Sequence, residues 1–102
     1  MTEFRFDRFV IEPDRRRILV NGEAAKIGAR AFDLLMALIE RRDRVVSKNE
    51  LLDLVWGADR EVTRGTVDSY ISYLRAKIDA LPARPLIHTV RGVGYVMREV
   101  YE

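Results

Sequence analysis

The 102-residue chain has no cysteine, one histidine and no long apolar run. The absence of thiols excludes disulfides, thiolate zinc sites and thiol redox centres. The longest mostly apolar run, residues 31–39, is interrupted by Asp33 and is far shorter than the roughly 20 residues that a membrane helix needs. Charged residues stand near the start, where a secretory signal is apolar: Glu3, Arg5 and Asp7. We therefore expect a cytoplasmic protein with a single domain over residues 1–102.

Neither sign of charge is in large excess, because the chain has 18 basic and 16 acidic side chains. Residues 1–62 hold 12 of each sign, whereas residues 63–102 hold six basic and four acidic side chains. The whole net charge of +2 thus lies in the C-terminal part of the chain. So small an excess is only weak support for a polyanionic partner, and the motifs must decide.

Catalytic groups are scarce as well. His88 is the only imidazole and falls inside a predicted strand, where a side chain satisfied by local contacts is a simpler interpretation than a catalytic base. Asp and Glu are scattered among Arg and Lys, which is typical of surface pairs. A phosphate-binding glycine loop stands at the start of a helix, but the glycines of residues 92–94 do not. We expect no enzymatic activity, no cofactor and no metal.

The first 27 residues contain short extended runs separated by turn signals. Asn21-Gly22 lies between two such runs and is a strong hairpin signal, since both turn positions tolerate positive φ. Residues 4–27 are therefore predicted to form a small antiparallel sheet, with a return strand over 23–27. Within it, the basic run 15–17 is interpreted most simply as a solvated strand edge.

Three helices are predicted next. Apolar residues recur at helical spacing over 29–41. Ser47 and Glu50 fit a capping box, in which the Ser47 side chain accepts from the Glu50 N–H and the Glu50 carboxylate reaches back to the Ser47 N–H. The helix that they open should stop at Gly57, a residue type favoured just past a helix end.

A third helix is predicted over 64–80. It has a buried stripe of Val67, Ile71, Leu74 and Ile78, and the opposite face carries Ser69, Ser72, Tyr73 and Ala76. Two strands, 86–90 and 95–97, then form a hairpin around residues 91–94, where Gly92 and Gly94 let the backbone bend and approach another molecule. This order predicts an α+β fold: a winged helix-turn-helix with a β platform (4–27), a three-helix core (29–81) and a C-terminal hairpin wing (86–98).

Three blocks of sequence resemble the DNA-binding effector domain of OmpR/PhoB-type response regulators. Residues 46–57, from Val46-Ser47-Lys48 to Trp56-Gly57, are similar to the second helix of that family. Thr66-Val67-Asp68 with Leu74-Arg75-Ala76-Lys77-Ile78 resembles its recognition helix. His88-Thr89-Val90-Arg91-Gly92-Val93-Gly94-Tyr95 resembles its wing. The order and spacing of the three blocks make the resemblance specific.

The resemblance implies a sequence-specific transcription factor whose helix 64–80 enters the major groove and whose wing reaches a minor groove. Thr89 and Arg91 match wing contacts, Trp56 matches a backbone-contacting position, and Arg75 matches a basic position of the recognition helix. The expected DNA-contacting residues are Trp56, Arg64, Thr66, Ser69, Tyr70, Ser72, Tyr73, Arg75, Lys77, Thr89 and Arg91. Two alternatives stay open: packing roles for Trp56, Tyr70 and Tyr73, and a winged helix used mainly for protein contact.

Some positions depart from the family pattern. Ser72 and Tyr73 stand where the family often has two arginines, which removes bidentate guanine readout and predicts a site rich in A·T pairs. Gly65 replaces a frequent arginine, and residues 28–31 lack the usual threonine and glutamate. The resemblance also implies a monomer or weak dimer that binds direct repeats head to tail, with a polymerase-contacting or merely solvated loop at 57–62.

Overall fold

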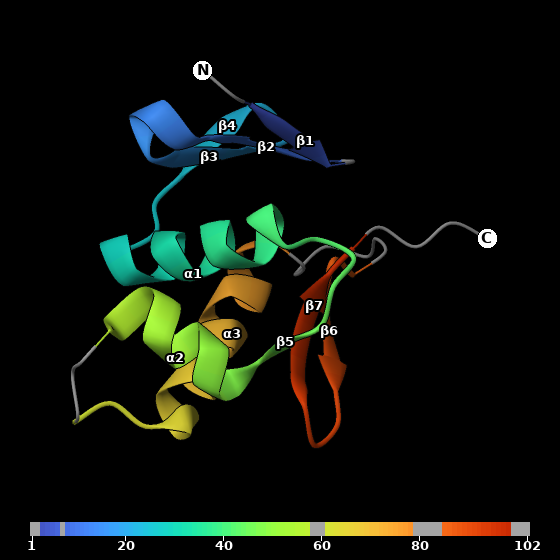
Figure 1. The fold of residues 1–102 in the computed structure, drawn as a ribbon. Coiled ribbons are helices and arrows are strands. Elements are labelled where there is room, and N and C mark those ends of the chain that lie inside the picture. The colour runs from blue at the N-terminus through green and yellow to red at the C-terminus, as the bar shows by residue number, and fades with distance from the viewer. Residues whose placement is uncertain (1–2, 7, 58–60, 79–84, 99–102) are drawn as a thin grey trace.

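Seven short strands, three α-helices and one turn of 3-10 helix follow one another in the computed structural model, which describes residues 3–6, 8–57, 61–78 and 85–98. The first four strands lie at one end of the molecule, and the helices lie beneath them (Figure 1). The last two strands form a hairpin beside the helices (Figure 1). The predicted α+β winged helix-turn-helix is confirmed.

The platform is an antiparallel sheet whose strands are in chain order: β1 (Phe4–Phe6), β2 (Phe9–Glu12), β3 (Arg17–Val20) and β4 (Glu23–Ala25). Ile11 of β2 pairs with Ile18 of β3, and both side chains are fully buried. Asn21 and Gly22 have φ angles of 52° and 86°, which confirms the predicted hairpin turn. The strand β4 ends two residues earlier than the predicted return strand.

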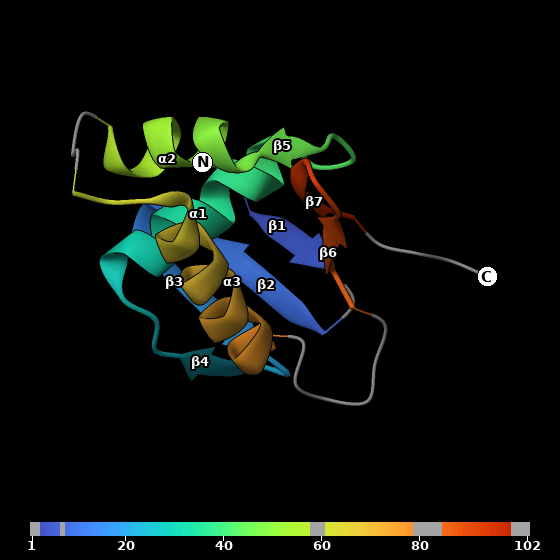
Figure 2. The ribbon, with the colours of Figure 1, turned by 90° about the horizontal axis from the view of Figure 1, so that it is seen from below.

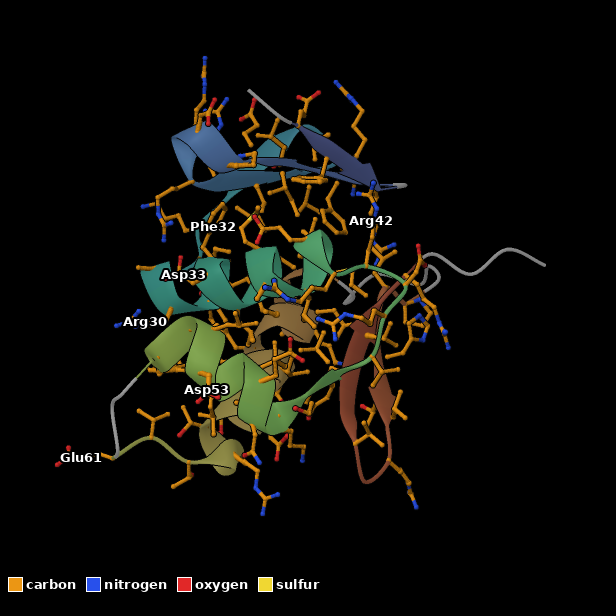
Figure 3. The ribbon with its side chains drawn as sticks, viewed as in Figure 1. Arg30, Phe32, Asp33, Arg42, Asp53 and Glu61 are labelled. Atoms are coloured by element: carbon orange, nitrogen blue, oxygen red, sulfur yellow. The ribbon has the colours of Figure 1, made fainter. Side chains whose placement is uncertain are left out.

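Helix α1 (Ala29–Glu40) lies between the platform and the other two helices, α2 (Lys48–Trp56) and α3 (Arg64–Ile78) (Figure 1). Because it has neighbours on both sides, seven of its twelve residues are buried. Phe32 points from α1 toward the platform (Figure 3). Leu35 and Leu38 of α1 are fully buried in the same core as Phe32. The platform and the helices therefore share one apolar core.

The wing is the antiparallel hairpin of β6 (Ile87–Val90) and β7 (Gly94–Met97) with its turn, residues 91–93. A two-residue strand, β5 (Val46–Ser47), pairs with β7 and gives the sheet order β5-β7-β6. The strand β5 could not be predicted from the sequence, because two residues carry no alternation pattern. Gly92 has a φ of 77°, as its turn position requires, but Gly94 is buried and approaches β5 of its own chain.

Arg15 and Arg16 of the basic run 15–17 are exposed, as predicted, but Arg16 also makes contacts that the sequence did not predict. Arg16 takes a left-handed conformation with φ 49°, donates to the Asp33 carboxylate at 2.9 Å and lies 4.8 Å from the centre of the Phe32 ring. It thus joins the platform to α1. Asp33 points outward from α1 beside Phe32 and Arg30 (Figure 3).

The helix limits agree with the predictions except in detail. Ser47 accepts from the Glu50 N–H at 3.0 Å, but the Glu50 carboxylate pairs with Arg44 at 3.0 Å instead of reaching back to Ser47. The capping box is therefore only half formed. Helix α2 ends before Gly57, whose φ is 62°, as predicted. The predicted end of the third helix, at residue 80, lies outside the described residues.

Candidate nucleic-acid interface

The two faces of α3 have opposite characters. Val67, Ile71, Leu74 and Ile78 are buried, and they fix the helix on the core as predicted. The opposite side is exposed and mostly small or polar: Ser69, Ser72, Tyr73 and Ala76. Figure 2 shows α3 on the surface, in front of the platform, with the wing to one side. This face is open to a large partner.

The wing turn lies near the beginnings of α2 and α3. Arg91 is exposed at this turn, and Val93 is 51% exposed. A surface cavity of about 580 Å³ separates the turn from the two helices, and its lining comes from all three elements: Ser47, Lys48, Asn49, Arg64, Asp68, Gly92 and Val93. The recognition helix and the wing therefore border one hollow.

Asp68 on α3 is the centre of a polar cluster at the edge of this hollow. The Tyr95 hydroxyl of β7 donates to its carboxylate, and the Lys48 Nζ of α2 lies 3.0 Å away. The hydrogen bond from Tyr95, helped by Lys48, lowers the pKa of Asp68. Burial and the bond to Asp68 raise the pKa of Tyr95 to about 12. At neutral pH, Asp68 is thus an ionised carboxylate and Tyr95 is a neutral phenol.

Arg75 holds the other strand of the wing. Its guanidinium donates to the Thr89 hydroxyl at 2.7 Å and to the Ile87 carbonyl at 3.2 Å. Its carbon Cζ also lies 5.6 Å from the centre of the Tyr95 ring. The guanidinium of this predicted DNA contact is therefore on the wing, and not on the exposed face of α3.

The predicted aromatic residues divide into two kinds. Trp56 and Tyr70 are half-buried against the core with their rings 5.2 Å apart, in an edge-on arrangement at 63°. The packing alternative therefore holds for both residues. Tyr73 is 40% exposed, and its hydroxyl lies 3.4 Å from the Lys26 carbonyl oxygen.

The platform also holds the far end of α3. Arg8 donates to the Ile78 carbonyl through Nε at 2.9 Å and Nη2 at 2.7 Å. A cation at this end satisfies a helix carbonyl and complements the helix dipole. The orientation of α3 is thus fixed by the platform at its C-terminal end and by the wing along its middle, through Asp68 and Arg75.

The structure brings most of the predicted contact residues to one region. Seven are exposed: Arg64, Ser69, Ser72, Tyr73, Lys77, Thr89 and Arg91. Four are half-buried: Trp56, Thr66, Tyr70 and Arg75. Sequence reasoning missed Lys48 and Asp68. The only signal for Asp68 was its spacing of seven residues from Arg75, which puts both on one face of a helix.

Groups for metal chemistry are not assembled in the described segments, where no three His, Asp or Glu side chains gather into a possible metal site. His88 Nε2 lies 3.2 Å from the Arg98 carbonyl oxygen, a local contact of the kind predicted. The helices described here are too short or too polar to span a bilayer.

Residues 22–97 match the family model described as "Transcriptional regulatory protein, C terminal". The chain is 47% identical over 83 residues to the transcriptional regulatory protein PrrA of Mycobacterium leprae, covering 81% of this chain. It spans only 36% of PrrA. The match confirms the resemblance of the three sequence blocks to a family of transcription factors and not of enzymes.

Solved structures agree with the sequence matches. The DNA-binding domain of CpxR from Escherichia coli is 30% identical with a TM-score of 0.80, over 95% of this chain and 96% of that one. The Klebsiella pneumoniae RstA DNA-binding domain, solved in complex with the RstA box, is 29% identical with a TM-score of 0.78, over 95% of this chain and 97% of that one. The chain therefore belongs to the OmpR/PhoB-type C-terminal DNA-binding domains of response regulators.

Proposed function

We propose that this domain binds double-stranded promoter DNA in a sequence-specific way, with α3 in the major groove and the wing in a neighbouring minor groove. One observation carries the proposal: the N-terminal part of α3, with Arg64 and Asp68, and the turn that bears Arg91 border the same hollow. The RstA complex supports it, since a domain of the same fold is bound there to its DNA box. DNA binding also favours the cytoplasmic location expected from the sequence.

The exposed residues carry the direct contacts in this proposal. Ser69, Ser72 and Tyr73 face the bases, Arg64 and Lys77 face phosphates, and the wing adds Thr89 and Arg91. The half-buried residues shape and support that surface: Trp56, Thr66, Tyr70 and Arg75. Small side chains on α3 permit a close approach to the base edges, where thymine methyl groups offer apolar contact.

Selection of bound sequences from a random duplex library, repeated over a salt series, tests this proposal. We expect a consensus rich in A·T pairs under α3, because Ser72 and Tyr73 do not present the paired donors that guanine accepts. The salt dependence of the binding constant should give the number of phosphates contacted. A G-rich consensus beneath these two residues, or no enrichment at all, would contradict the proposal.

We also propose a monomer or weak dimer in solution that binds direct repeats head to tail. Only three large hydrophobic side chains of the described residues are exposed, and they do not lie on one element: Leu54, Tyr73 and Val93. They offer no continuous apolar stripe of the kind that a tight dimer buries.

The connection between α2 and α3, residues 57–62, is proposed as a contact for RNA polymerase. Glu61 lies at the outer edge of the molecule and points away from it (Figure 3), while residues 58–60 are outside the described part. Changing Asp59 and Glu61 together to alanine should reduce transcription from the target promoter and leave DNA affinity unchanged. Equal losses of transcription and DNA binding would remove the support for this contact.

A further inference from the structure

Two wing residues that pair with each other are both held by α3. Thr89 of β6 lies directly opposite Tyr95 of β7, one pair before the end of the hairpin ladder. Arg75 donates to the Thr89 hydroxyl at 2.7 Å, and Asp68 accepts from the Tyr95 hydroxyl. We name Asp68, Arg75, Thr89 and Tyr95 the wing clamp.

The spacing of the helical partners explains how one helix holds both strands. Asp68 and Arg75 are seven residues apart, nearly two full helical turns, so they lie on the same side of α3. Arg75 also contacts the face of the Tyr95 ring, with Cζ 5.6 Å from its centre. Asp68 and Arg75 thus both contact the same cross-strand pair, which lies one pair before the turn that carries Arg91.

Contacts other than the clamp hold the outer part of the wing only weakly. The strand β5 pairs with β7 over only two residues, Val46 with Tyr95 and Ser47 with Gly94. Beyond this pairing, Arg91, Gly92 and Val93 are exposed. The hydrogen bonds of the clamp have a charged partner on α3 in each case, and such bonds are stronger than neutral ones.

We propose that Asp68 and Arg75 are positioning residues for DNA binding: through Tyr95 and Thr89, they set where the wing stands relative to the recognition helix. The inference rests on the proposed role of Arg91 in the minor groove. A wing fixed in this way presents Arg91 at a set distance from the exposed face of α3. The domain then discriminates between sites by the spacing of their major-groove and minor-groove determinants, and not only by their bases.

A double-mutant cycle with Tyr95→Phe and Arg91→Ala tests the inference, with binding to the selected duplex as the readout. Tyr95→Phe removes only the hydroxyl and preserves the ring volume, so the fold should persist. We expect it to weaken binding about fivefold, the effect of one hydrogen bond. In the Arg91→Ala background the same change should have a much smaller effect, because the Arg91 contact that the clamp positions is gone.

A second variant separates positioning from charge. Asp68→Asn removes one negative charge, which by electrostatics alone should strengthen binding to DNA. The clamp predicts the opposite: weaker binding, with less discrimination between A·T and G·C pairs at the wing end of the site. Asp33→Asn on α1 is the matched control, since it removes the same charge from a carboxylate that is paired with a basic side chain, Arg16, as Asp68 is with Lys48.

The outcomes distinguish the inference from the proposed function. If Tyr95→Phe weakens DNA binding equally in both backgrounds, or only as far as it lowers thermal stability, the hydroxyl has a merely structural role. Either result would overturn the clamp. Asp68→Asn binding as tightly as Asp33→Asn would overturn it as well. If Arg91→Ala itself does not weaken binding, the proposed minor-groove contact fails, and the clamp with it.

Discussion

At the scale of single residues, Gly94 shows how a structural requirement can be hidden in the sequence. From the sequence, this glycine was expected to let the wing bend and another molecule come close. In the structure it is buried in β7, and a Cβ built on it would lie 2.0 Å from the Val46 carbonyl oxygen of β5. The close neighbour is the backbone of the same chain, brought there by a strand that the sequence did not reveal.

Gly94→Ala should therefore lower the free energy of unfolding by about 2 kcal/mol or more, because a backbone atom cannot move aside as a flexible side chain can. Gly65→Ala is the matched control. Its added Cβ would meet only Thr63 Oγ1 at an ordinary 3.5 Å, and alanine favours the helix, so we expect a gain of up to about 1 kcal/mol. Urea unfolding of both variants checks the pair. Equal stabilities would contradict the close packing of β5 on β7.

At the scale of elements, the periodicity of apolar residues predicted the long helix α3 but not the two-residue strand β5. The buried stripe predicted both the buried and the exposed face of α3, because four apolar positions at helical spacing define one side: Val67, Ile71, Leu74 and Ile78. The strand β5 has two residues and no period to detect. The contacts of Arg16 were missed for a similar reason: its partners, Asp33 and Phe32, lie on another element.

The same distinction applies to the candidate site. Arg91 and the exposed face of α3 were predictable, since a wing turn and a helix face are local patterns. The roles of Lys48 and Asp68 were not predictable, because their contact joins α2 to α3. Asp68 also accepts a hydrogen bond from Tyr95 in the wing, which is distant in the sequence. Packing roles for Trp56 and Tyr70 were among the predicted alternatives, but not the contact between their rings, which joins two helices. Sequence reasoning found the residues that face outward and missed the contacts between elements.

At the scale of the whole molecule, the platform, helices and wing fix one surface. Arg8 holds one end of α3 against the platform, and the wing holds its middle through Arg75 and Asp68. The excess of basic charge lies in residues 63–102, which contain the recognition helix and the wing. A rigid, mildly basic surface with small side chains at its centre is suited to a DNA duplex.

The most direct test of this account measures Arg91→Ala twice on one preparation: its stability, and its affinity for the selected duplex. Arg91 is exposed, so stability should stay within a few tenths of a kcal/mol. Affinity should fall by roughly 1–3 kcal/mol, with relaxed preference at the wing end of the site. Arg15→Ala, an exposed arginine on the platform side, controls for the lost charge and should bind almost as the parent does. Unchanged affinity of Arg91→Ala, or a loss matched by unfolding, would contradict DNA binding through the wing.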